Sequence, residues 1–285
     1  MVQKIDLPAS IPKHAWNREN SRASESIPGT LFFPEGGSDV LVVFESGIPG
    51  REVDLHDYFA KPLGKEFNVY TTQLRNRGLS YSDGFSQDFM NKQSFVREFT
   101  GAKKVVYVGH SVGANVIARA INQFNLTPKG FYAISPFPSM GHTRTRNDDL
   151  NDRSLQHKIA DVVSEIFPFG PFGKPIPPLV SDVPMRMAIP ENDELANSMI
   201  SLNPFGSRIS LGVPNFPFKY DPRPEVMDRF RKYFGEVYPK AEVKTFSGKN
   251  HCFNYKPFDF VPLNRDSPEE LIEDFREFVY KVTSK

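Results

Sequence analysis

Short apolar segments alternate with amphipathic segments along most of the chain. The apolar segments are rich in β-branched and aromatic residues and are bounded by Gly, Pro and Ser, a pattern typical of strands. Strands are predicted at 30–34, 39–46, 67–74, 103–109, 130–135, 184–189 and 241–246. Apolar residues at helical spacing predict helices at 86–99, 114–125, 224–237 and 267–282. This alternation predicts an α/β fold, with a mostly parallel central sheet and helices on both faces.

The alternation fails between about residues 137 and 182. That interval holds one candidate helix, at 154–167, and a Phe- and Pro-rich run without a clear strand. Proline breaks helices, whereas phenylalanine needs a surface to pack against, so the run suits irregular structure over a core. We therefore predict one core domain formed by 1–136 and 183–285, with 137–182 as a cap insertion.

The charge balance argues against a nucleic-acid partner. Thirty-five Lys and Arg face 34 Asp and Glu, a net charge of +1 that supplies no long-range attraction for phosphate backbones or anionic membranes. Cys252 is the only cysteine, which fits a reducing compartment. We expect a cytoplasmic protein without integral membrane association, since the sequence shows neither a signal-peptide pattern nor an apolar run of spanning length.

Candidate chemistry begins at Gly109-His110-Ser111-Val112-Gly113, between a predicted strand and a predicted helix. This is the context of a nucleophile elbow, in which the glycines permit a sharp turn and the serine projects from it. Sites in α/β folds form at such carboxyl ends of strands. Ser111 is therefore the candidate nucleophile.

A serine hydroxyl needs a base to remove its proton and a carboxylate to orient that base. The fold places the acid and then the histidine after the serine along the chain. His251 follows the strand 241–246 and is the candidate base. Asp193 follows the strand 184–189 and is the preferred acid, with Glu191 and then Glu194 as alternatives.

An oxyanion hole completes such a site. It uses the N–H of the residue after the nucleophile and one N–H from an earlier loop. Val112 would supply the first and Ile48 the second, with Gly47 and Gly50 allowing close approach of the backbone.

Five sequence motifs in order resemble the α/β-hydrolase fold superfamily, over about residues 27–282. They are "SGIPG", "LRNRGLSYSDG", "VGHSVGAN", "IPENDELA" and "GKNHCF". Ser46 stands where the family usually has His, and Leu79-Ser80 departs from the usual Gly-x-Ser. The resemblance implies Ser111 as nucleophile, Asp193 as acid, His251 as base, and Ile48 and Val112 as oxyanion donors.

The resulting hypothesis is a serine hydrolase that cleaves a carboxylic ester or thioester through an acyl-enzyme on Ser111. The many aromatic residues favour a small, partly apolar substrate, because most small-molecule sites are lined by such side chains. The reaction requires no cofactor and no metal. Two alternatives stay open: a ligand-binding, receptor-type member of the fold with little or no turnover, and an amidase or lyase that uses the same triad.

Overall fold

The 285-residue chain is described by a computed structural model. The structure describes residues 2–9, 27–45, 59–72, 83–136, 178–192, 231–232, 234–236, 238–250, 253 and 269–284. All structural statements below concern these residues.

The described residues are organised around an eight-stranded sheet with the strand order β1-β2-β4-β3-β5-β6-β7-β8. The strands are β1 (Val2–Ala9), β2 (Ile27–Pro34), β3 (Val40–Glu45), β4 (Asn68–Thr72), β5 (Lys104–His110), β6 (Gly130–Ile134), β7 (Met185–Asn192) and β8 (Glu242–Asn250). β1 pairs with β2, and β2 with β4, in antiparallel fashion. The remaining neighbours pair in parallel, which confirms the predicted mostly parallel sheet.

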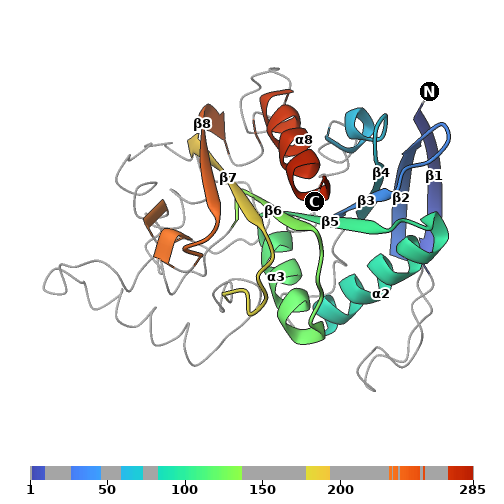
Figure 1. Cartoon of the computed structure of the whole chain (residues 1–285), viewed down its shortest axis with the longest axis horizontal. Helices are drawn as coiled ribbons and strands as arrows, with labels where there is room; N and C mark the ends of the chain where they lie inside the picture. The colour runs from blue at the N-terminus through green and yellow to red at the C-terminus, as the bar shows by residue number, and fades with distance from the viewer. Residues whose placement is uncertain are drawn as a thin grey trace, which may run out of the picture.

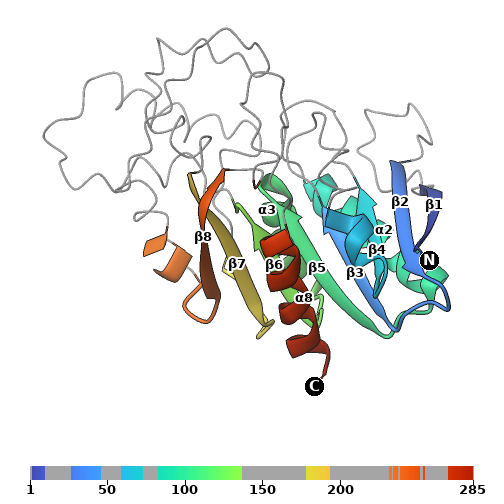
Figure 2. The ribbon, with the colours of Figure 1, turned by 90° about the horizontal axis from the view of Figure 1, so that it is seen from above.

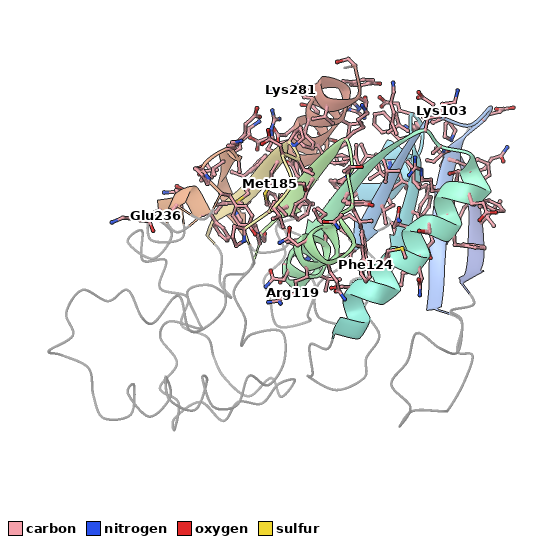
Figure 3. All side chains as sticks on the ribbon, turned by 60° about the horizontal axis from the view of Figure 1, so that its bottom comes forward. Lys103, Arg119, Phe124, Met185, Glu236 and Lys281 are labelled. Carbon is pink, nitrogen blue, oxygen red and sulfur yellow. The ribbon has the colours of Figure 1, made fainter. Side chains whose placement is uncertain are left out.

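Helices cover both faces of this sheet, as predicted. α2 (Asp83–Thr100) and α3 (Val112–Phe124) lie on one face, and α8 (Glu269–Thr283) lies on the other (Figure 1). Figure 3 shows the same arrangement, with Arg119 and Phe124 on α3 and Lys281 on α8 across the sheet. The predicted helix 224–237 is helical at 231–232 and 234–236, whereas the predicted helix 154–167 lies outside the described residues.

The period of two in a strand divides the core into two layers. On β3, Leu41 and Val43 belong to the cluster that contains α2 and α3 side chains. Val42 and Phe44 point the other way, into the cluster that contains Phe275 of α8. Both faces of β3 are therefore buried, which fits the unbroken apolar run from Val40 to Phe44.

A buried carboxylate fixes α8 to the sheet. Asp274 accepts hydrogen bonds from the hydroxyl of Tyr132 on β6 (2.5 Å), from Nη1 of Arg186 on β7 (3.0 Å) and from Nζ of Lys244 on β8 (2.8 Å). Burial, followed by the charge of Asp274, raises the pKa of Tyr132 well above its usual range, so the phenol stays a donor. One side chain on α8 thus holds three adjacent strands.

Two strands extend further than predicted. β7 continues to Asn192 and β8 to Asn250, although the apolar pattern stops at 189 and 246. Except for Pro190 and Gly248, the residues beyond those points are polar, and the backbone ladder between β7 and β8 continues there through a register shift. β1 was not predicted at all, since charged residues and Pro8 interrupt its apolar positions, as is common at a sheet edge.

The parallel strands β3 to β8 run in one direction, so their carboxyl ends meet at the same edge of the sheet (Figure 2). Among the candidate site residues that the structure describes, Gly109, Ser111, Val112 and Gly113 lie at the carboxyl end of β5, and Glu191 lies near that of β7. Most of the predicted insertion, 137–177, lies outside the described residues. Its last residues return beside α3, where Asn122 donates to the carbonyl of Pro178 (2.8 Å) and accepts from the N–H of Val180 (3.0 Å). No helix in the described part of the chain is long and apolar enough to cross a membrane.

Candidate active site

Ser111 occupies a strained turn between β5 and α3. Its backbone has φ 54° and ψ −120°, a combination that non-glycine residues rarely adopt. The turn is fixed on both sides: the N–H of Ser111 donates to the carbonyl of Ile134 on β6 (2.8 Å), and its own carbonyl accepts from the N–H of Ala114 (3.2 Å). Although Ser111 is the N-cap residue of α3, its hydroxyl makes no capping hydrogen bond. A strained serine between a strand and a helix is the geometry that the predicted nucleophile elbow requires, and the role of Ser111 as nucleophile stays a prediction.

Gly109 is required by the close approach of α3 to β5. A Cβ at this position would lie 2.5 Å from Cα and 2.6 Å from N of Ala114, which are backbone atoms that cannot move aside. Gly113 is the second residue of α3, inside the turn itself. The steric reason proposed from the sequence for these glycines therefore holds for Gly109.

Val112 is the first residue of α3. The first N–H groups of a helix have no partner within it, and the positive end of the helix dipole lies there. The Val112 N–H is therefore suited to bind an oxyanion. Gly47, Ile48 and Gly50, predicted to form the other half of the oxyanion hole, lie outside the described residues.

A buried ion pair lies where this oxyanion loop begins. Glu45 ends β3 directly before the loop and is paired in register with Gly109 of the elbow strand. Its Oε2 lies 3.5 Å from Nζ of Lys92 on α2, and the two side chains are only 1% and 2% exposed. The pKa of nearby Tyr70 is raised, first by burial and then by the charge of Glu45. This pair was not predicted from the sequence, in which its one signal is a glutamate that closes an apolar strand.

Asp193 and His251, the predicted acid and base, both lie outside the described residues. The structure describes the residues that precede them: Asn192 ends β7, Asn250 ends β8, and these two are register partners in the sheet. Beyond His251, Phe253 is again described and buried, and its ring lies 5.1 Å from that of Phe246 on β8. The described parts of the site thus bring the attachment points of the acid and the base together at one edge.

Glu191, the alternative acid, was expected in a loop after the strand. It lies within β7 instead. Its Oε2 accepts hydrogen bonds from Oγ of Ser247 (2.6 Å) and from the N–H of Gly248 (2.8 Å), both on β8. These two hydrogen bonds lower the pKa of Glu191, and the bond from Ser247 has the larger effect. Glu191 is therefore ionised at neutral pH. The other alternative, Glu194, lies outside the described residues, and no group of three or more potential metal ligands occurs among those described.

Comparison with solved structures identifies the fold. The chain superimposes on Est1E from Butyrivibrio proteoclasticus with a TM-score of 0.53 and 12% identity, covering 92% of this chain and 97% of that one. A hormone-sensitive lipase from a metagenome library gives a TM-score of 0.58 at 14% identity, with 99% and 86% covered. The Pyrococcus furiosus esterase Pf2001 gives 0.52 at 15% identity, with 99% and 90% covered.

The chain therefore has the α/β-hydrolase fold, as its motifs suggested. No protein-family model and no curated protein matches its sequence. At 12–15% identity, the similarity to these solved structures shows the fold alone.

Proposed function

We propose that this chain is a serine hydrolase that cleaves a carboxylic ester or thioester carrying an apolar acyl or alcohol part. Ser111 attacks the carbonyl carbon while His251 takes its proton, and Asp193 holds the imidazole in the required tautomer. The N–H groups of Val112 and Ile48 stabilise the tetrahedral oxyanion. His251 then protonates the leaving group, and water, activated by the same imidazole, hydrolyses the acyl-enzyme.

The observation that carries this proposal is the backbone of Ser111. A strained conformation at a non-glycine residue costs on the order of 1–3 kcal/mol and persists where its surroundings enforce it, most often at functional sites. Here it aims a serine at the carboxyl edge of the sheet beside a helix N-terminus. A plain strand-to-helix turn would not need this conformation.

The ends of β7 and β8 support the remaining two roles. Consecutive Cα atoms are about 3.8 Å apart, so Asp193 and His251 are each one peptide unit away from the register partners Asn192 and Asn250. Chain connectivity alone therefore keeps the acid near the base. In the strand order, β6 and β7 separate β5 from β8, so the histidine must reach back across the edge toward Ser111.

Two of the solved structures named above are described as an esterase and a hormone-sensitive lipase, and the proposal assigns an activity of that kind to this chain. We further propose that the segment 137–182 caps the site and contributes to a partly apolar pocket for a small-molecule substrate. No metal or cofactor takes part in the proposed mechanism.

A covalent probe tests the nucleophile directly. Wild-type protein incubated with a fluorophosphonate should gain one adduct on Ser111, and Ser111→Ala should gain none. The kcat for hydrolysis of p-nitrophenyl esters of increasing acyl length should fall by about 10⁶-fold in Ser111→Ala and by about 10⁴-fold in Asp193→Asn. A folded wild-type protein without an adduct and without esterase activity would refute the proposal, and tight binding of a small ligand under those conditions would favour the receptor-type alternative.

A further inference from the structure

We propose that Glu191 is a positioning residue that holds the end of β8 from which His251 emerges. The inference rests on the proposed function, since the position of His251 affects catalysis only if its imidazole is the base. In this role Glu191 is not the triad acid, although its position in the sequence also allowed that assignment.

The first observation is an irregularity in the β7–β8 ladder. Pro190 pairs with Phe246, but the next described pair is Asn192 with Asn250. Between these pairs β7 advances from 190 to 192 while β8 advances from 246 to 250, so β8 contains two additional residues. Such a bulge interrupts the ladder and re-aims the residues that follow it, and bulges are frequent next to active sites.

The second observation is that the Glu191 side chain bridges this bulge. Gly248 lies inside it with φ +67°, in the left-handed region that favours glycine. A bulge deprives backbone N–H groups of their ladder acceptors, and Oε2 of Glu191 supplies one for the N–H of Gly248 at 2.8 Å. The same oxygen accepts from the hydroxyl of Ser247 at 2.6 Å. One carboxylate oxygen thus fixes two consecutive residues of the bulge.

The third observation is the position of the bulge relative to the candidate base. Asn250 is back in register directly before His251, and Phe253, two residues after His251, packs on Phe246. Phe246 and Asn250 are the two ends of the bulge, so its conformation sets how far, and in which direction, β8 delivers the histidine. Ser247 and Gly248 are exposed, so apolar packing does not fix their conformation. Their hydrogen bonds to Glu191 fix it instead.

The two roles of Glu191 differ in what they require of the side chain. A positioning residue needs an acceptor oxygen, which glutamine retains. A triad acid needs a negative charge to stabilise the imidazolium, which glutamine lacks. Glu191→Gln and Glu191→Ala therefore separate the roles.

The test combines steady-state kinetics on a p-nitrophenyl ester with hydrogen exchange of the backbone amides in 247–250. Glu191→Ala should lower kcat by about 10- to 100-fold with little change in KM, because a displacement of about 1 Å costs up to this much. It should also speed amide exchange across 247–250. Glu191→Gln should stay within about 3-fold of wild type in kcat and exchange like wild type, since its amide oxygen can accept both hydrogen bonds. Glu98→Ala, at an exposed position on α2, is the matched control and should change neither readout.

Three results would overturn the inference. If Glu191→Gln lowers kcat as much as Glu191→Ala does, the negative charge of Glu191 is essential. Unchanged kcat in Glu191→Ala would show that the bulge does not position the base, and lowered kcat without faster exchange would show that Glu191 acts in another way. If wild type hydrolyses no ester and takes no probe, the proposed function has failed instead, whereas the exchange comparison still reports whether Glu191 holds the bulge.

Discussion

Replacing Asp274 with Asn should destabilise the protein far more than the same change at Asp182. Both aspartates make a short ion pair, Asp274 with Lys244 at 2.8 Å and Asp182 with Lys240 at 2.6 Å. The Asp274 side chain is 1% exposed, whereas those of Asp182 and Lys240 are 83% and 82% exposed. The pair of variants therefore compares a buried carboxylate that accepts from Tyr132, Arg186 and Lys244 with an exposed carboxylate that pairs with Lys240.

The expected magnitude follows from the partners that each carboxylate loses. Removing one member of a buried ion pair costs about 3–5 kcal/mol, because the other charge stays buried without compensation. Here the cost is reduced, since Arg186 keeps Glu242 and Glu277 as partners and Lys244 is half exposed. We expect about 2–4 kcal/mol for Asp274→Asn and less than about 1 kcal/mol for Asp182→Asn.

Thermal and urea unfolding followed by circular dichroism measure both variants. At about 2–4 °C per kcal/mol for a chain of this size, Asp274→Asn should lower Tm by roughly 4–16 °C. The far-ultraviolet spectrum at 20 °C should stay that of the wild type, because the core around α8 is otherwise unchanged. Equal losses in the two variants, or a loss below about 1 kcal/mol at Asp274, would show that this network does not hold α8 to the sheet.

Three further outcomes are expected. Gly109→Ala should abolish ester hydrolysis and lower Tm, because the added Cβ meets the backbone of α3. Gly235→Ala is the control: a Cβ at that position has no neighbouring atom within 4 Å, so activity and Tm should stay unchanged. Lys92→Met should lower the free energy of unfolding by about 3–5 kcal/mol in urea melts, because it leaves the Glu45 carboxylate buried without this partner. Adding Glu45→Gln should recover part of that loss. If the losses of the two single variants simply add in the double variant, the buried pair is contradicted. In an alkaline titration followed at 295 nm, Tyr132 should stay protonated at pH 11, so that Tyr132→Phe leaves the absorbance change there unaltered.

The fold was predictable where burial on both faces leaves a strong apolar signal. β3, β5 and β6 appear in the sequence as short runs without charges inside them, and the predicted boundaries differ from the structure by only one residue at either end. β1 carries no such signal because it pairs with β2 along only one edge of the sheet. The ends of β7 and β8 were missed since a side-chain acceptor and a bulge, rather than apolar packing, continue that ladder.

The candidate site was predictable to the extent that backbone geometry forces particular residue types. The elbow needs glycine where α3 meets β5, and that requirement is visible as Gly109 two residues before Ser111. Glu45 and Lys92 left no comparable pattern, because an ion pair between residues 47 positions apart requires only that the fold bring them together. Glu191 was visible as a carboxylate in the right segment, but only its contacts with β8 separate a positioning role from an acidic one.

The contacts around Ser111 explain how its strained backbone conformation is maintained. A cost on the order of 1–3 kcal/mol would relax if the turn could rotate, since φ near −60° is available to serine in most turns. Three neighbours prevent this: β6 accepts the N–H of Ser111, the first turn of α3 donates to its carbonyl, and Gly109 packs against the same turn. β5 itself is buried along nearly its whole length, so none of these neighbours can shift without disturbing the core. A turn without chemistry gains nothing from being held this way, whereas a nucleophile held in advance avoids the cost of orientation at each turnover.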